Sequence, residues 1–145
     1  MADELPFALD QGFDRLYGLE VTDAGDGAMR GTVPVRDQIK QPAGLVHGGI
    51  YAAIAESLST IGTALAVIDD GKTAVGLSNL TSFLRPITEG TINAQARARH
   101  RGRTTWVWEV ELTDDRGRLC AMTRVTVAIR ERVSACAPRA PARTA

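Results

Sequence analysis

One segment in the middle of the chain, residues 47–71, constrains the fold more than any other. It opens with His47-Gly48-Gly49, ends at Asp69-Asp70-Gly71, and between them carries apolar side chains almost all the way round a helix. A helix of about 20 residues with this pattern is about 30 Å long and must be buried on most sides. We therefore expect a central helix that other elements enclose, with Gly71 as a left-handed C-cap. Its apolar residues are Ile50, Tyr51, Ile54, Leu58, Ile61, Leu65 and Ile68.

After this helix the hydrophobic pattern changes to a period of two, which is typical of strands with one buried face. Turn residues at 100–103 and 114–117 separate three long runs of this kind. Three consecutive strands joined by tight turns predict an antiparallel meander. The expected strands are Lys72–Leu84, Thr91–Arg99, Thr105–Leu112 and Leu119–Ile129.

The region before the helix predicts a short helix and a hairpin. The helix is expected from about Ala8 to Tyr17, and the hairpin pairs Leu19–Val21 with Ala28–Val35 through a turn at residues 24–27. Residues 36–46 lack periodicity and form a loop that leads into the long helix. Together these elements predict an α+β fold, in which a curved antiparallel sheet of five to six strands wraps around one long central helix.

Length and composition indicate one domain, at residues 7–132, between a flexible N-terminus at 1–6 and a disordered Ala/Pro/Arg tail at 133–145. Lys and Arg number 17 and Asp and Glu number 17, and a balanced net charge argues against a nucleic-acid partner. Glu56 within the apolar stretch argues against a membrane span. Cys120 and Cys136 are expected as free thiols, and with only two histidines we expect no metal site. A cytoplasmic protein is the expectation.

Four polar residues interrupt the apolar helix at the spacing i, i+3, i+4 and i+7, which places them on one face: Glu56, Ser59, Thr60 and Thr63. The face is either the solvated side of the helix or a functional surface. One carboxylate with three small hydroxyls is unlike a solvated face, which normally carries Lys, Arg and several Glu.

The glycine pair at the helix start has two interpretations as well. Gly48 and Gly49 either only make a tight turn or expose first-turn N–H groups to a ligand. Such donors stabilise negative charge that develops on a carbonyl oxygen, as an oxyanion hole does.

The segment from Gln41 to Gly49, followed by Glu56 and Thr60, resembles the active-site segment of hotdog-fold acyl-CoA thioesterases. The closest types are the phenylacetate-degradation and 4-hydroxybenzoyl-CoA thioesterases that use a helix glutamate. The resemblance continues through residues 78–86, 104–108 and 114–121, and it spans about residues 16–132.

This resemblance implies a hotdog fold and the hydrolysis of an acyl-CoA thioester to a free acid and coenzyme A. The Gly48 N–H and the Gln41 side chain would polarise the thioester carbonyl, and Glu56 would attack it or activate water. Thr60 would orient the carboxylate or the water, and His47 would shape the loop. The site would lie between two protomers of a homodimer that assembles into a homotetramer. The implied substrate-binding residues are Gly49, Asn79, Ser82, Arg85, Arg103 and Thr104.

The resemblance implies no metal and no cofactor, since coenzyme A is part of the substrate. Ile61 and Leu80 are apolar where hydroxybenzoyl-specific members are more polar, so an unsubstituted aromatic or a medium-chain acyl group is expected. The alternative is a non-catalytic acyl-CoA-binding module, against which the intact Gln41 and Glu56 argue. A hotdog dehydratase is disfavoured, because this chain has no Asp beside His47 at the helix start.

A basic cluster marks one predicted turn, and it consists of Arg97, Arg99, His100, Arg101 and Arg103, with Arg85 expected nearby across strands. It is either a cradle for the phosphates of coenzyme A or a solvated hairpin whose charges prevent edge-to-edge pairing.

Overall fold

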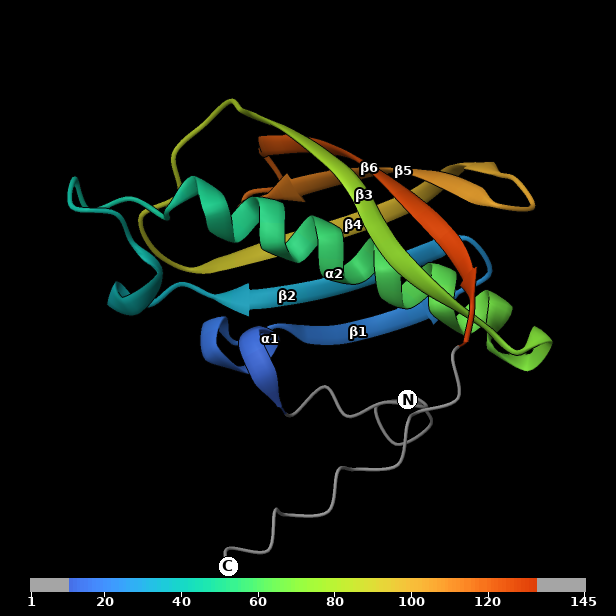
Figure 1. Ribbon diagram of the computed structural model, residues 1–145. Helices are drawn as coiled ribbons and strands as arrows, with labels where there is room; N and C mark the ends of the chain where they lie inside the picture. Colours follow the sequence, from blue (N-terminus) through green and yellow to red (C-terminus); the bar gives the residue numbers. More distant parts are fainter. Residues whose placement is uncertain (1–10, 133–145) are drawn as a thin grey trace, which may run out of the picture.

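A computed structural model describes residues 11–132, in which one long helix packs against a six-stranded antiparallel sheet (Figure 1). The helical elements are α1 (Gly12–Tyr17), the 3-10 turn η2 (Asp37–Ile39), α2 (Gly48–Val67) and the 3-10 turn η3 (Ile68–Asp70). The strands are β1 (Glu20–Gly25), β2 (Ala28–Pro34), β3 (Lys72–Phe83), β4 (Thr91–Arg101), β5 (Thr105–Thr113) and β6 (Leu119–Glu131).

The strand order is β1-β2-β4-β5-β6-β3, so the predicted meander of β4, β5 and β6 is confirmed. The strand that directly follows α2 does not enter this meander. Instead β3 runs antiparallel to β6 and forms one edge of the sheet, while β1 forms the other edge. Figure 1 shows α2 running along the inner side of the curved sheet, with β3 and β1 on either side of it.

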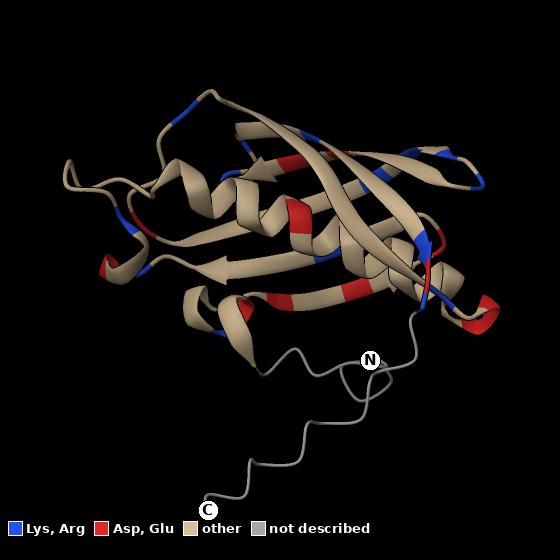
Figure 2. Ribbon diagram, in the orientation of Figure 1, with Lys and Arg blue, Asp and Glu red and all other residues tan. Residues whose placement is uncertain are grey.

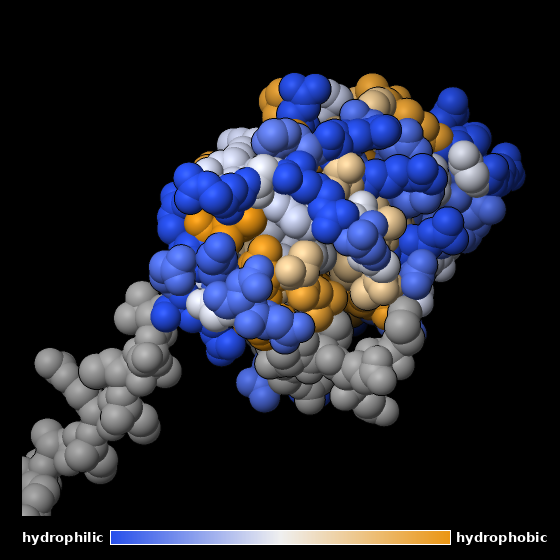
Figure 3. Space-filling view, turned by 90° about the vertical axis from the view of Figure 1, so that its right-hand side faces the viewer, coloured by the Kyte–Doolittle hydropathy of each residue, from blue (hydrophilic) through white to orange (hydrophobic). Residues whose placement is uncertain are grey.

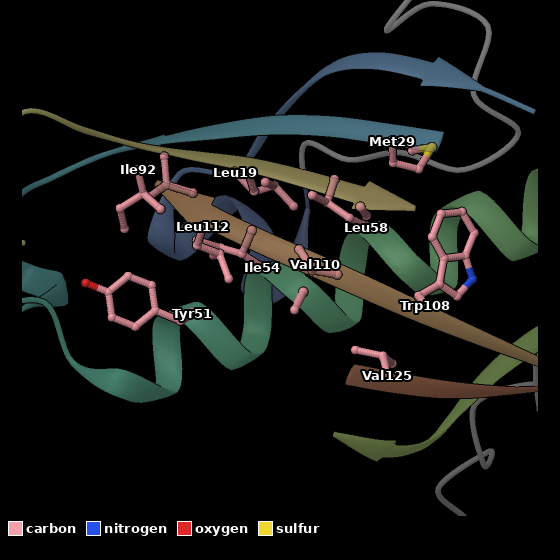
Figure 4. Packing of buried hydrophobic residues seen from close by; sticks show 14 of the residues in the cluster. Leu19, Met29, Tyr51, Ile54, Leu58, Ile92, Trp108, Val110, Leu112 and Val125 are labelled. Atoms are coloured by element: carbon pink, nitrogen blue, oxygen red, sulfur yellow. The ribbon is translucent and has the colours of Figure 1, made fainter. Parts of the chain in front are cut away.

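The core lies between α2 and the inner face of the sheet (Figure 4). Helix residues Ile54 and Leu58 are fully buried, and Trp108, Leu112 and Val125 cover them from the sheet. With its following turn, Gly48–Asp70 is long and apolar enough to cross a membrane, yet half of its apolar stretch is buried inside the protein. The sheet therefore covers one side of the central helix, so burial on most sides, which the apolar pattern predicts, is found for about half of its residues.

Several element boundaries differ from the predicted ones. The α-helix ends at Val67 and tightens into η3, so that Gly71, at a φ of 71°, caps the 3-10 turn rather than α2 itself. The hairpin turn shrinks to Asp26-Gly27, because Gly25 pairs with Ala28. The first helix starts at Gly12. Its expected start at Ala8 lies outside the described residues.

The basic turn between β4 and β5 also differs from its prediction. His100 and Arg101 belong to β4, where they pair with Val107 and Trp106 beyond a bulge at Arg99, so the turn contains residues 102–104 only. The expected flexible termini at 1–6 and 133–145, together with Cys136, lie outside the described residues.

Candidate active site

An open pocket of about 670 Å³ lies at the start of α2. The loop before the helix, the first turn of α2 and the end of β3 supply its walls. Five residues predicted for the site line this pocket: Gln41, His47, Gly48, Gly49 and Arg85. Leu45, Val46, Tyr51, Phe83, Leu84 and Pro86 complete the lining and make most of it apolar.

The two residues whose donors are predicted to polarise a carbonyl, Gln41 and Gly48, both line this pocket. Gln41 Oε1 accepts the Ala43 N–H at 3.0 Å, so its carbonyl is bound to the loop and its NH₂ group remains to donate. His47 Nδ1 accepts the Gly49 N–H at 2.9 Å and thereby caps the helix, which uses the Gly49 donor. The Gly48 N–H has no acceptor among residues 11–132, as first-turn N–H groups usually lack an intrahelical one. Beside the Tyr51 hydroxyl and the Arg85 guanidinium, the pocket thus offers both predicted carbonyl donors, one from the backbone and one from a side chain.

Aromatic side chains form the wall beside these donors. The ring of Phe83 packs on Gly48 so closely that a methyl group there would come within 2.7 Å of its Cζ. The Tyr51 and Phe83 ring centroids are 6.2 Å apart. Burial, followed by the nearby Cys120, raises the pKa of Tyr51 to about 12, so its phenol stays protonated at neutral pH. Sequence reasoning missed both aromatic residues as part of the site.

Glu56 does not line this pocket. It lies eight residues after Gly48 on the same helix, which corresponds to about 12 Å along the axis. Glu56 is the one charged residue of α2, and Figure 2 shows the rest of this helix in tan. Its carboxylate lies over Gly76 of β3, where an added Cβ would stand 3.1 Å from Oε1. Thr60 Oγ1 donates to the Glu56 backbone carbonyl at 2.7 Å, so its proton is used inside the helix.

The four-residue polar face of α2 is divided in two, contrary to the prediction of one surface. Glu56 is exposed and Thr60 partly so, whereas Ser59 and Thr63 are fully buried. Thr63 Oγ1 accepts from Trp108 Nε1 at 2.8 Å and donates to the Ser59 carbonyl at 2.8 Å. The i to i+7 face is about 100° wide, and the curved sheet covers one margin of it. Of the four residues, only Glu56 and Thr60 are accessible to a substrate or to water.

Two of the predicted substrate-binding residues lie on opposite faces of β3. Asn79 faces the helix and donates from Nδ2 to the Ala52 carbonyl at 2.9 Å. Ser82 is exposed and pairs with Met122, on the face opposite to Phe83. Neither of them lines the pocket around Gly48.

Arg103 and Thr104 lie at the far end of the sheet from Arg85. The Arg85 N–H donates to the carbonyl of Cys120, whereas the Thr104 carbonyl accepts from the N–H of Ile129. Nine residues of β6 separate these points, or about 30 Å. The expectation that Arg85 lies beside the basic turn is therefore wrong, because the end of β3 that leads to Arg85 pairs with the start of β6, whereas the β4–β5 turn lies beside the end of β6.

Two arginines of the basic cluster contact neighbouring side chains. Arg99 pairs with Glu109 at 2.7 Å, and Arg101 pairs with Asp26 at 2.6 Å while stacking 4.5 Å from the Trp106 ring centroid. The end of the molecule that carries this turn is mostly hydrophilic, with smaller apolar areas between the polar side chains (Figure 3). These contacts favour the interpretation as a solvated hairpin for Arg99 and Arg101.

Comparison with known proteins identifies the family. The model of the thioesterase superfamily matches residues 43–121. The proofreading thioesterase EntH of Cronobacter turicensis is 35% identical over 77% of this chain and 81% of its own length. The 1,4-dihydroxy-2-naphthoyl-CoA hydrolase of Escherichia coli K12 is 36% identical over 72% of this chain and 76% of its own.

A solved structure agrees with this assignment. The crystal structure of a mutant thioesterase from Pseudomonas aeruginosa superposes with a TM-score of 0.83 at 32% identity, covering 89% of this chain and 93% of that one. One central helix against a six-stranded antiparallel sheet is the hotdog arrangement that the motifs predict. On its sequence and its fold, this chain belongs to the thioesterase superfamily, as an enzyme of the hotdog type.

Proposed function

We propose that this protein hydrolyses acyl-CoA thioesters with an aromatic or medium-chain acyl group to the free acid and coenzyme A. The observation that carries the proposal is the pocket at the start of α2, where unused donors of Gly48 and Gln41 adjoin an apolar wall. The names of the two relatives, a proofreading thioesterase and an acyl-CoA hydrolase, support the same reaction class.

In the proposed complex, the thioester oxygen accepts hydrogen bonds from the Gly48 N–H and the Gln41 NH₂ group. These donors stabilise the negative charge that develops as the carbonyl carbon becomes tetrahedral. The acyl group lies against Tyr51 and Phe83. Arg85, at the end of β3, contacts the phosphates of coenzyme A, which its planar guanidinium suits.

Glu56 supplies the step that breaks the thioester. As a general base it takes a proton from water, and the resulting hydroxide adds to the carbonyl carbon. As a nucleophile it adds directly, and water later hydrolyses the anhydride. In both routes the tetrahedral intermediate expels the thiolate of coenzyme A, which then takes up a proton. Thr60 lies one turn on and accepts a hydrogen bond from the attacking water. The proposed reaction uses only side chains, backbone donors and water.

Gly48 and Glu56 of one chain are too far apart to act on the same carbonyl, so the proposed site combines two chains. The edge strand β3 offers the contact, because its outer edge is unpaired in the sheet and long exposed edges readily pair with another chain. Pairing β3 with a second copy would give the predicted homodimer, and two homodimers the homotetramer. Exposed apolar residues of this edge are Val75, Leu77, Leu80, Phe83 and Leu84.

Release of free thiol from a panel of aryl-CoA and medium-chain acyl-CoA substrates tests the proposal. We expect turnover of at least one class, and a loss of kcat of about 10²–10⁴-fold in Glu56→Gln, which keeps the shape but removes the basic carboxylate. The variant should keep the wild-type circular dichroism spectrum. Binding of acyl-CoA without any release would instead favour the non-catalytic module. A cytoplasmic location remains a prediction.

A further inference from the structure

A single bulge in β3 changes which of its residues face α2: even-numbered residues face the helix before it and odd-numbered residues after it. Gly76 pairs with Val127 and Ser78 pairs with Thr126, which leaves Leu77 without a partner on β6. Directly opposite residues of an antiparallel pair share a face. Before the bulge, Gly76 faces inward with the buried Val127, and after it the odd-numbered residues do so. The extra residue thus turns Asn79, Thr81 and Phe83 toward the helix.

Asn79 uses this orientation to hold the backbone of α2. Its Nδ2 donates to the Ala52 carbonyl at 2.9 Å, and that carbonyl also accepts the backbone N–H of Glu56 in the i to i−4 pattern of an α-helix. Thr81 Oγ1 donates to Asn79 Oδ1 at 2.9 Å and lies 3.0 Å from Thr123 Oγ1. The carbonyl side of the amide is therefore fixed, and its NH₂ group points at the helix.

The residue on the other side of the bulge makes room for the Glu56 carboxylate. Gly76 carries no side chain, and a Cβ there would stand 3.1 Å from Oε1, which is tighter than ordinary van der Waals contact. The bulged segment thus meets Glu56 directly at one point and indirectly at another: Gly76 lies under the carboxylate, and Asn79 binds the Ala52 carbonyl that accepts the Glu56 backbone N–H.

We propose that Asn79 is a positioning residue for Glu56, which it acts on through the Ala52 carbonyl and the turn of α2 between them. This inference rests on the proposed function and replaces substrate binding as the role of Asn79. Because β3 is the edge that the proposed dimer pairs, Asn79 also links the position of that edge to the position of the carboxylate.

The experiment compares two nearly isosteric substitutions with a matched control. Asn79→Leu removes the donor, and Asn79→Asp places an acceptor against the Ala52 carbonyl. We expect Asn79→Leu to lower kcat per folded site by about 3–10-fold, the loss that corresponds to one hydrogen bond. Asn79→Asp should lower it by at least as much, and KM should stay within about twofold for both, because Asn79 does not line the pocket. Ser78→Ala, on the exposed neighbour, should keep wild-type values.

A double-mutant cycle separates positioning from a general loss of structure. In a Glu56→Gln background, with the residual rate measured on an activated aryl thioester, Asn79→Leu should cause no further loss. The same loss in both backgrounds, or a wild-type kcat in both Asn79 variants, would overturn the inference. Asn79→Asp provides the same comparison if Asn79→Leu yields little folded protein. If Glu56→Gln itself turns over normally, the proposed function fails, whereas an inactive Glu56→Gln beside active Asn79 variants removes this inference alone.

Discussion

The first turn of α2 and its third turn differ in what surrounds them. At the first turn, the loop residues Gln41 and His47 bond to the backbone, and a defined pocket holds the free N–H of Gly48. At the third turn, Glu56 is exposed, and what touches it is the edge strand β3. One region provides carbonyl donors without a carboxylate, and the other a carboxylate outside the pocket. A single chain thus carries the two halves of the proposed site at separate places on one helix.

Mixing chains that each lack one half should produce the largest effect. Gln41→Ala removes a donor and Glu56→Gln removes the base, so each pure variant is expected to be at least about 10²-fold slower than wild type. In an equimolar mixture that exchanges subunits, about a quarter of the sites of a two-site dimer combine two intact halves. Thiol release by the refolded mixture should therefore rise to about a quarter of the wild-type rate.

The control for this mixture is each variant refolded alone. Mass spectrometry of the mixed sample should show the heterodimer. Mixed dimers that form and stay inactive would mean that both halves act within one chain.

Gly48→Ala tests the donor half. The added methyl would lie 2.7 Å from Phe83 Cζ and beside the N–H that the carbonyl oxygen approaches. We expect kcat/KM to fall by about tenfold or more, up to the loss of about 10²–10³-fold that removal of a whole oxyanion donor causes. Adding Phe83→Ala distinguishes the cause: recovery points to the collision with the ring, and continued loss points to the methyl group blocking the carbonyl. A fully active Gly48→Ala would remove this turn from the site.

Arg85→Ala tests whether the pocket mouth contacts the nucleotide. Arg85 would contact the phosphates equally in the ground and transition states, so losing this contact should raise KM and leave kcat nearly unchanged. At a wet and screened position, the lost binding free energy should be about 1–2 kcal/mol. The same acyl group on a short pantetheine thiol should show no defect, since it has no nucleotide. An equal defect with both substrates would make Arg85 a structural residue at the end of β3.

Thr63→Val should have the smallest effect on turnover, although Thr63 shares the polar stripe with Glu56. The substitution leaves Trp108 Nε1 without its buried acceptor, so the free energy of unfolding should fall by about 1–3 kcal/mol. Denaturant titration measures this loss, while kcat per folded site should stay within about twofold of wild type. A large loss of kcat in folded protein would show that the buried margin of the stripe takes part in the reaction.

Local sequence patterns predict those features of the fold that depend on residues close together in the chain. The period of two predicts β4, β5 and β6 in the observed order, since consecutive strands that are joined by short turns usually pair with each other. The apolar pattern predicts the central helix α2 and the side that it packs on the sheet, and the His-Gly-Gly start places Gly48 in the pocket. Gly71 adopts the predicted left-handed conformation.

Other features were decided by contacts between residues far apart in the chain. The curvature of the sheet covers Thr63 with Trp108 and leaves Glu56 open, although both lie on one predicted face. The pairing of β3 with β6 sets Arg85 and Thr104 at opposite ends, and the bulge at Leu77 turns Asn79 and not Ser78 toward α2. Side-chain periodicity is a property of each element by itself, so the sequence determines the elements and, where no bulge interrupts the pattern, the inner faces of the strands. Register, bulges and edges arise only when one element pairs with another. These features determine which side chains from distant parts of the chain contact each other.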